Sequence, residues 1–267
     1  MPALNGSLRL VLDWLAFTGL WPAAVAASLV AACALALGAG PSGHRLLTAM
    51  ALAIGGTLVV YNVDRLRDLD HDRMTAPARS DFVDRHRRAL TRVVGGSATA
   101  CLPLAALLPP KVWGVCAVAL GLGLFHRRLK GKRAFLSVLY VTLAWVAVGV
   151  GIPWAASADP GSVTAAAGVT ALTVGPAIAA NLIGSQERGH SPTPQQRFRL
   201  RVGGAIALAG CLVPLVAGAV LPLIAIPLAA WLSLALFRNH ERYGLLVLDG
   251  ALLAGAGIAS AVIVAGP

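Results

Sequence analysis

Long apolar stretches recur along the whole chain, and they constrain its fold more than any other feature. An α-helix needs about 20 mainly apolar residues to cross the hydrocarbon core of a bilayer. The chain supplies such stretches repeatedly, and with 57% hydrophobic and only 12% charged residues it is too apolar for an ordinary soluble domain. The sequence therefore predicts an all-α integral membrane protein.

The stretches predict nine transmembrane helices, at 14–38, 46–62, 89–108, 111–126, 134–154, 163–184, 202–219, 221–237 and 245–265. The fourth and eighth are short, and Pro214, Pro222 and Pro227 make the boundary between the seventh and eighth the least defined. No loop is long enough to contain a soluble catalytic domain. Residues 1–267 are therefore expected to form one membrane domain.

Basic residues are divided unequally between the two sides of these predicted helices. All but two of the 22 Lys and Arg residues, Arg45 and Lys111, fall on the side of the N-terminus. Because short cytoplasmic loops are enriched in Lys and Arg, we expect a multi-pass protein of the cytoplasmic membrane with its N-terminus and polar loops inside and its C-terminus outside. A basic face beside anionic lipid explains the net charge of +11 without a nucleic-acid partner.

The four cysteines, Cys33, Cys101, Cys116 and Cys211, all lie within predicted helices and indicate neither a disulfide framework nor a zinc ribbon. The first apolar stretch is of full length and lacks an obvious cleavage site of small residues, so it is expected to be a retained helix. Neither feature changes the expectation of a helical membrane protein.

Charges gather in one stretch, Tyr61 to Arg88, which holds six acidic and seven basic residues and two histidines. Within it Asp64, Asp68 and Asp72 recur every four residues, so on a continued helix their Cβ atoms would lie about 5–6 Å apart along one face. One interpretation is a salt-bridged helix extension on a solvated surface. The other is a hard-cation site, because Mg²⁺ takes oxygen ligands from a few carboxylates and the phosphates of a substrate. The spacing alone favours neither interpretation.

A second polar segment, NLIGSQERGH, begins at Asn181 where the sixth predicted helix ends, just as Asn62 ends the second. This correspondence predicts an internal repeat, 46–154 and 163–265, of the kind many membrane proteins contain. Each half would open with a span followed by an Asn-led polar loop on the same side. The repeat predicts that the two polar loops converge over one cavity.

These features resemble the UbiA-type intramembrane prenyltransferases, which have nine helices and two cytoplasmic motifs of the form N-D-x-x-D-x-x-x-D. The segment from Asn62 to Asp72, with Pro77 and Arg79 after it, is similar to the first motif with its acids shifted in frame. The resemblance implies a nine-helix UbiA-type bundle that binds an isoprenyl diphosphate through Mg²⁺. It also implies transfer of the prenyl group to an aromatic or other lipophilic acceptor within the membrane.

The resemblance further implies individual roles. The segment from Phe125 to Lys130 is loosely similar to the family's Tyr-x3-Lys element, which makes Lys130 a candidate diphosphate ligand. The implied catalytic residues are Asp64, Asp68 and Lys130; the implied diphosphate ligands are Asn62, Arg79, Lys130, Arg133 and Asn181; the implied metal ligands are Asp64, Asp68, Asp72 and Glu187.

The second polar segment departs from the family pattern N-D-x-x-D-x-E-G-D. Asn181 and Glu187 match it, but Leu182, Ser185 and Gly189 stand at its three Asp positions. Glu187 is thus expected to hold at most a weakened second Mg²⁺, and an ion pair with a neighbouring Arg is an equally good interpretation of this residue. The departure favours one alternative to a prenyltransferase, a non-catalytic isoprenoid- or lipid-binding homologue. A terpene cyclase on the same scaffold is another.

One further acid, Asp249, lies in the otherwise apolar ninth stretch. Ionisable groups within spans usually face the bundle interior, where Asp249 would orient an Arg, position a phosphate ligand or bind the acceptor. If the helix instead begins near Leu248, Asp249 lies in its first turn at the membrane surface, where the helix dipole favours an acid. The sequence does not decide between these two locations.

Overall fold

A computed structural model describes residues 6–38, 40–125, 134–187, 193–218, 220–239 and 243–266, and all regular structure in these ranges is helical. The α-helices are α1 (Gly6–Phe17), α2 (Leu20–Ala36), α3 (Gly43–Arg67), α4 (Leu69–Thr75), α5 (Pro77–Arg85), α6 (Arg87–Ala106), α7 (Pro110–Phe125), α8 (Ala134–Val146), α9 (Ile152–Ala156), α10 (Thr164–Gln186), α11 (Pro194–Ala217), α12 (Ala225–Ala235) and α13 (Asp249–Ala265). Two π-helical segments, η2 (Ala147–Gly151) and η4 (Tyr243–Leu248), and one 3-10 segment, η3 (Leu221–Ile224), join them. The expectation of an all-helical protein is therefore confirmed for the described residues.

Six helical stretches among the described residues are long and apolar enough to cross a membrane, and the bent pair formed by α1 and α2 makes a seventh if it is counted as one span. The remaining two predicted spans correspond to shorter apolar helices, Pro110–Leu124 and Leu221–Ala235. At 16 residues, α7 is only about 24 Å long, against about 30 Å for the hydrocarbon core. The architecture is thus that of a multi-pass helical membrane protein, and the number of nine crossings stays a prediction.

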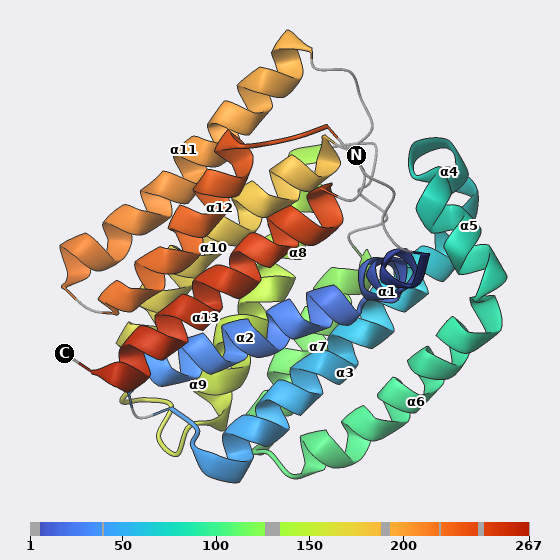
Figure 1. The fold of residues 1–267 in the computed structure, drawn as a ribbon. Helices are drawn as coiled ribbons and strands as arrows, with labels where there is room; N and C mark the ends of the chain where they lie inside the picture. The colour runs from blue at the N-terminus through green and yellow to red at the C-terminus, as the bar shows by residue number, and fades with distance from the viewer. Residues whose placement is uncertain are drawn as a thin grey trace.

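Helix α2 lies at the centre of the bundle, between α3 and α13 (Figure 1). Its residues Val25 and Leu29 belong to a buried cluster shared with α10, α12 and α13, while Ala26 and Val30 belong to a second cluster shared with α3 and α9. Each pair is four residues apart and therefore occupies one stripe of the helix. Because α2 is apolar on both stripes, it can join the two groups of helices into one bundle.

Small residues let some of these helices approach closely. A Cβ atom on Gly255 of α13 would lie 2.7 Å from the Cα atom of Ile226, and one on Gly210 of α11 would lie 2.9 Å from the carbonyl oxygen of Thr173. Contacts at such distances leave no room for a side chain. Close packing at small residues is the usual way in which transmembrane helices associate.

The axis turns by 59° between α1 and α2. Gly19 adopts a positive φ of 79° at this break, a conformation that costs glycine little. The carbonyl oxygens left free at the end of α1 are bonded by α3: Asn62 Nδ2 donates to Thr18 O at 2.8 Å, and an Arg65 guanidinium nitrogen donates to Ala16 O at 3.1 Å. The bend is therefore stabilised by the polar end of α3.

Both predicted spans that lead into polar segments continue further than the sequence indicated. Helix α3 ends at Arg67 rather than at Asn62, and α10 ends at Gln186 rather than near 184. A helix that leaves the apolar region keeps its backbone bonded internally, so polar side chains do not end it. The helical register of α3 does stop at Asp68, whose backbone bends before α4 begins at Leu69, so a single helical face does not run from Asp64 to Asp72.

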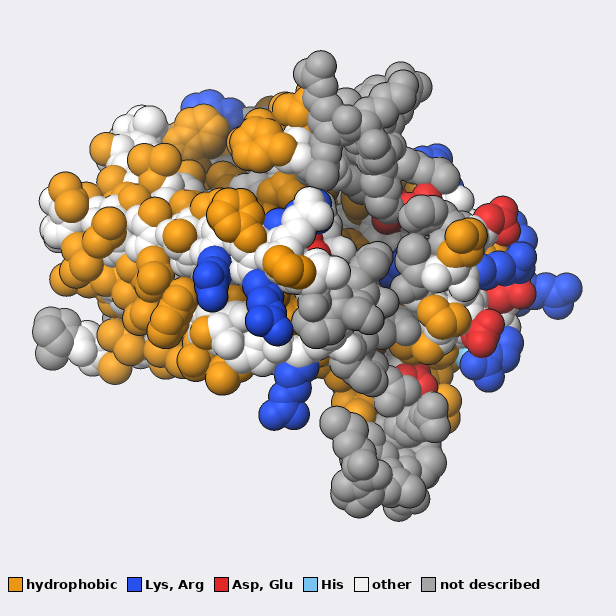
Figure 2. Space-filling model, turned by 90° about the horizontal axis from the view of Figure 1, so that it is seen from above, with side chains coloured by type: hydrophobic (Ala, Val, Ile, Leu, Met, Phe, Trp, Pro, Cys, Tyr) orange, Lys and Arg blue, Asp and Glu red, His pale blue; other side chains and the backbone are white. Residues whose placement is uncertain are grey.

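The charged stretch after α3 is folded back onto α1 by aromatic contacts. Trp14 of α1 packs edge-on against Phe82 of α5, with ring centroids 5.3 Å apart, and against His86 at 5.0 Å. Phe17 lies 5.5 Å from the same Phe82 ring. Figure 2 shows acidic and basic side chains mixed on the side of the molecule where α4 and α5 lie, while hydrophobic side chains predominate on the opposite side.

Candidate functional site

A cavity of about 760 Å³ lies among α3, α6, α7, α8 and α10. Its volume is in the range of pockets that enclose small organic ligands. Most of its wall is apolar, formed by small and branched side chains of these helices. Leu52 and Ile152, which line it, also belong to a buried cluster of the bundle, so the cavity extends into the packed interior.

One wall of the cavity is a single helix thick. Ala98, Cys101, Leu102 and Ala105 of α6 line it, although α6 is buried over only 6% of its apolar part. Leu102 is 74% exposed. The same helix therefore faces both the cavity and the outer surface of the bundle.

Polar residues of the first charged segment line the cavity at the end of α3. They are Asp64, Arg65 and Asp68, joined by Arg79 of α5. Arg65 and Asp68 are each only 5% exposed. Because α3 continues past Asn62, it carries these side chains to the cavity on a rigid helix, and Pro77 at the start of α5 sets the turn that returns Arg79 to it.

The second polar segment reaches the same cavity through Asn181, Ser185 and Gln186 of α10. Asn181 is 5% exposed, and its Nδ2 atom is buried without a hydrogen-bond partner. The Ser185 hydroxyl donates to the carbonyl oxygen of Leu182 at 2.9 Å. Asp68 and Asn181 thus line one cavity, as the comparison of the two polar segments predicted.

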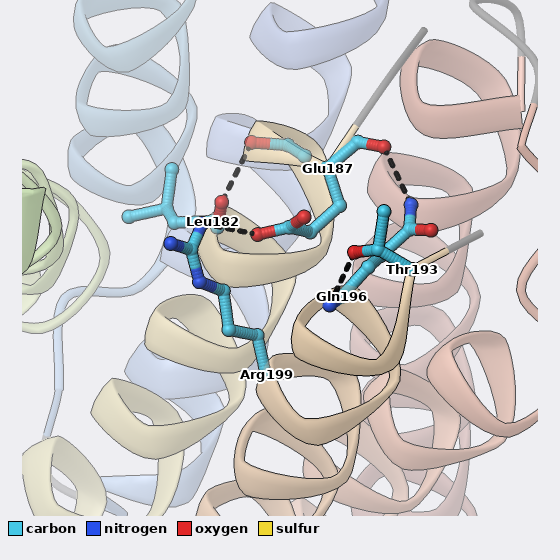
Figure 3. A network of polar contacts seen from close by, with 6 residues as sticks. Leu182, Glu187, Thr193, Gln196 and Arg199 are labelled. Atoms are coloured by element: carbon cyan, nitrogen blue, oxygen red, sulfur yellow. Dashed lines mark hydrogen bonds and ion pairs between the residues drawn. The ribbon is translucent and has the colours of Figure 1, made fainter. Parts of the chain in front are cut away.

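Glu187 does not line this cavity. An Arg199 guanidinium nitrogen donates to its carboxylate at 2.9 Å, and Gln196 Nε2 donates to its carbonyl oxygen at 2.9 Å (Figure 3). Thr193, the N-cap of α11, accepts from the backbone of Gln196 and fixes the start of that helix. Of the two interpretations drawn from the sequence, the structure contains the ion pair with a neighbouring Arg.

Asn62 is also directed elsewhere. Its Nδ2 atom donates to Thr18 O and to Leu58 O, both at 2.8 Å, and the residue is fully buried outside the cavity lining. Its observed contacts are therefore those of a residue that stabilises the bend between α1 and α2. Lys130 and Arg133, predicted from the resemblance, lie outside the described residues, as does the side chain of Asp72.

Asp249 lines the cavity and also lies in the first turn of α13. Asp249 therefore lies both at the cavity and at the start of its helix, so the two locations considered from the sequence do not exclude each other. The π-helical segment η4 directly precedes Asp249, and the Tyr243 hydroxyl at its start donates to Ser233 O at 2.7 Å. Burial raises the pKa of the Tyr243 phenol, and the charge of Arg238 lowers it in part. Segments of π-helix within α-helices are frequent at functional sites.

Tyr61 and Trp145 were not identified from the sequence, and they are the aromatic residues among the described part of the lining. Their ring centroids are 6.3 Å apart with the planes nearly perpendicular. The Arg65 guanidinium carbon lies 5.6 Å from the Tyr61 ring centroid. The sequence could have indicated that Tyr61 lies beside Arg65, because residues four apart occupy the same face of a helix.

The charges of the described lining consist of three carboxylates, from Asp64, Asp68 and Asp249, and two guanidinium groups, from Arg65 and Arg79. An anionic head group would therefore meet a net negative wall unless a cation accompanied it. Among the described residues, no three His, Cys, Asp or Glu side chains lie close enough together to hold one metal ion. A cation bound here would take part of its ligands from the head group, as Mg²⁺ commonly does with phosphates.

No protein-family model, curated protein or solved structure matches the chain. Over the described residues, the fold is helical with the architecture of a multi-pass membrane protein, and the site is a partly open cavity that is apolar over most of its wall and charged at one end.

Proposed function

We propose that the chain is a UbiA-type prenyltransferase, which transfers a prenyl group from an isoprenyl diphosphate to an aromatic or other lipophilic acceptor in a Mg²⁺-dependent reaction. One observation carries the proposal. A single cavity unites Asp64, Asp68 and Arg79 of the first polar segment with Asn181 of the second and continues as an apolar chamber into the bundle. That shape and charge match an amphiphile with a phosphorylated head and a hydrocarbon tail.

In this proposal the residues at the charged end of the cavity bind either the diphosphate or the cation. Arg65 and Arg79 donate to diphosphate oxygens, while Asp64 and Asp68 hold the cation. Asn181, on the same wall, is a further candidate diphosphate ligand by resemblance. Donors aimed at developing charge in a water-poor site stabilise a transition state more than they do in water. Mg²⁺, when bound, neutralises the diphosphate and helps it to leave. Lys130 and Arg133 remain candidate diphosphate ligands by resemblance.

The apolar chamber accounts for the second half of the reaction. When the carbon–oxygen bond to the diphosphate breaks, the leaving group keeps the electron pair and an allylic cation remains. Aromatic faces attract cations, and Tyr61 and Trp145 are available on the wall. The acceptor then forms a bond to the prenyl carbon and gives up a proton. Exclusion of water protects the cation from capture as an alcohol.

The location of the chain follows from the same proposal. We infer a cytoplasmic membrane in which the end of the bundle carrying α4 and α5 faces the cytoplasm, where soluble isoprenyl diphosphates and Mg²⁺ are available. The distribution of Lys and Arg, with Arg45 and Lys111 alone on the other side, supports this orientation.

One observation favours a second candidate function. The second polar segment lacks the three aspartates of the family pattern, and its Glu187 is bonded to Arg199 outside the cavity lining. A chain with the cavity but with a weakened cation site would bind an isoprenoid without turnover. A terpene cyclase, in which the cation is captured within the same prenyl chain, would use the same cavity.

A single experiment separates these functions. The full chain, reconstituted in lipid nanodiscs, is incubated with isoprenyl diphosphates of several lengths, with and without aromatic acceptors, in Mg²⁺ or in EDTA. Acceptor-dependent release of diphosphate, together with a prenylated product in mass spectra, is the expected result. Release without acceptor and a cyclic hydrocarbon product would identify a cyclase, and Mg²⁺-dependent binding without release would identify a binder. Absence of both binding and release would overturn the proposal.

A further inference from the structure

The start of α6 carries three exposed arginines, Arg87, Arg88 and Arg92. No acidic residue occupies the first turn of this helix. The acid nearest in sequence, Asp84 of α5, pairs instead with Arg73 at 3.8 Å. Within the part of the chain that the structure describes, no ion pair joins any of the three arginines to an acid. Their positive charge at this end of α6 is therefore not compensated by described acids.

Two of these arginines lie at the head of an exposed stripe along α6. Arg88 and Arg92 are four residues apart and so share one face of the helix. The exposed residues that continue this face are Gly95, Thr99, Leu102 and Ala106. The Thr99 hydroxyl donates to Gly95 O at 2.9 Å, so its hydrogen is satisfied within the helix. Leu90, which is fully buried, lies on the opposite face and anchors the start of α6 in the bundle.

The length of this stripe corresponds to one leaflet of a bilayer. Ten residues separate Arg92 from Leu102, a rise of about 15 Å on an α-helix. One leaflet contributes about the same distance, half of the ~30 Å hydrocarbon core. An acyl chain whose head group lies at Arg92 therefore reaches Leu102, which also lines the cavity.

We propose that this face of α6 binds an anionic phospholipid, with its phosphate on Arg88 and Arg92 and an acyl chain along the stripe to Leu102. Guanidinium groups bind phosphate oxygens through paired hydrogen bonds, and basic residues beside a membrane surface attract anionic lipids. A zwitterionic lipid carries its own cation, which the arginines repel, so an anionic head group is preferred. The bound lipid touches the edge of the cavity at Leu102, whatever ligand the cavity holds.

Helix α11 offers a matched comparison. Its Arg197 and Arg201 are exposed and likewise four residues apart, and Leu208 and Leu212 continue that face at 40% and 60% exposure. Helix α11 contributes no residue to the described cavity lining. Substitution of its two arginines removes the same charge as substitution of Arg88 and Arg92, but from a different exposed helix.

The test identifies the lipid that lies on α6. The photo-crosslinking residue benzoylphenylalanine replaces Thr99 in the full chain, which is reconstituted in nanodiscs of phosphatidylcholine with a minor fraction of phosphatidylglycerol. Mass spectrometry after irradiation measures the ratio of the two attached lipids. We expect phosphatidylglycerol to be enriched at least about fivefold over its share of the bilayer. Arg88→Gln combined with Arg92→Gln should abolish the enrichment, and Arg197→Gln combined with Arg201→Gln should retain it.

Two further measurements use the arginines as they are, so the test does not depend on the folding of a variant. Added sodium chloride screens exposed charges and should lower the enrichment. Excess inorganic phosphate at constant ionic strength should leave it unchanged, because a free anion makes no contact with the stripe. No enrichment, enrichment insensitive to salt, displacement by inorganic phosphate, or equal losses in the α6 and α11 double variants would each overturn the inference. The proposed function is tested separately, since none of these measurements requires a ligand in the cavity.

Discussion

Glu187 and Arg199 form an ion pair with a nitrogen–oxygen distance of 2.9 Å. Neither residue lines the cavity, although Asn181, in the helix that ends just before Glu187, does line it. The Glu187 side chain is 9% exposed and that of Arg199 is 49% exposed. The pair joins the end of α10 to the first turns of α11. Its observed contacts are those of a structural link between two helices.

We therefore expect Glu187→Gln to lower stability by about 1–2 kcal/mol, since it removes a charge-assisted bond that is partly screened by solvent. Binding of a diphosphate analogue should stay within about twofold of wild type, because the side chain is outside the cavity. Thermal unfolding in detergent and calorimetric binding measure the two quantities. A tenfold loss of binding at unchanged stability would show that Glu187 does hold a cation.

Asp68→Asn should abolish Mg²⁺-dependent binding of a diphosphate analogue. Asp68 is 5% exposed and lines the cavity, so its charge acts on a bound cation with little screening. The loss expected is at least about tenfold in affinity, measured by calorimetry with Mg²⁺ and again with EDTA. Asp70→Asn is the control, because the Asp70 side chain is 95% exposed and pairs with Arg73 on the surface. Equal losses of affinity in the two variants would show that Asp68 does not bind the cation.

Filling the apolar chamber should separate recognition of the tail from recognition of the head. Ala119 of α7 lines the cavity and is 9% exposed, so Ala119→Phe places a ring in the space proposed for the prenyl chain. We expect affinity for isoprenyl diphosphates to fall at least about tenfold, with binding of inorganic diphosphate unchanged. Val216→Phe, at an 88% exposed position, should change neither. Undiminished binding of the prenyl compounds in Ala119→Phe would contradict the tail position.

The proposed orientation predicts labelling from one side only. Met74, which is 87% exposed in α4, should react as Met74→Cys with an impermeant thiol reagent only from the cytoplasm. Ser162→Cys, in the exposed loop before α10, should react only from outside. The natural cysteines are replaced first, so each signal reports one position. If the Met74→Cys probe reacted only from outside, the proposed orientation would be wrong, and the proposed diphosphate site would not face the cytoplasm.

The bend between α1 and α2 should depend on glycine at position 19. Gly19 has a φ of 79°, and an added Cβ would lie 3.3 Å from Tyr61 Cβ. Gly19→Ala should therefore cost about 1–2 kcal/mol of stability and displace Tyr61 on the cavity wall. Gly95→Ala, in open space on α6, should be neutral or slightly stabilising. Thermal unfolding compares the two variants, and equal stability would show that the bend tolerates another conformation.

Hydrophobic stretches predicted the helical membrane architecture because burial in a bilayer requires long apolar runs. The ends of two helices were misplaced for a physical reason. Asn62 and Asn181 begin polar segments, but polarity does not break a helix whose backbone bonds continue, and the chain stays helical to Arg67 and Gln186. The break at Asp68 carries no local signal in the sequence, because neither glycine nor proline stands beside it.

The sequence grouped residues of the cavity wall best where they share a helix face. Asp64 and Asp68 are four residues apart and both line the cavity. Asn181 and Glu187 are six residues apart, which on a helix is a rotation of about 240°, and only Asn181 faces the cavity. If the helix had been assumed to continue through this segment, the sequence alone would have predicted that the two residues lie on different faces. The π-helical segment before Asp249 alters the rotation of α13 in a way that composition does not reveal.

The wall formed by α6 has a consequence for the environment in which this chain works. Its residues Ala98 and Leu102 border the cavity, and although α6 packs on α3, few residues of its apolar part are fully buried. Acyl chains are then the second layer of that wall. Changes in bilayer thickness tilt or shift such helices at a cost of fractions of a kcal/mol per Å, roughly the scale of thermal energy. The host lipids thus set part of the space open to a ligand, and membranes of different thickness should give the same polypeptide different selectivity.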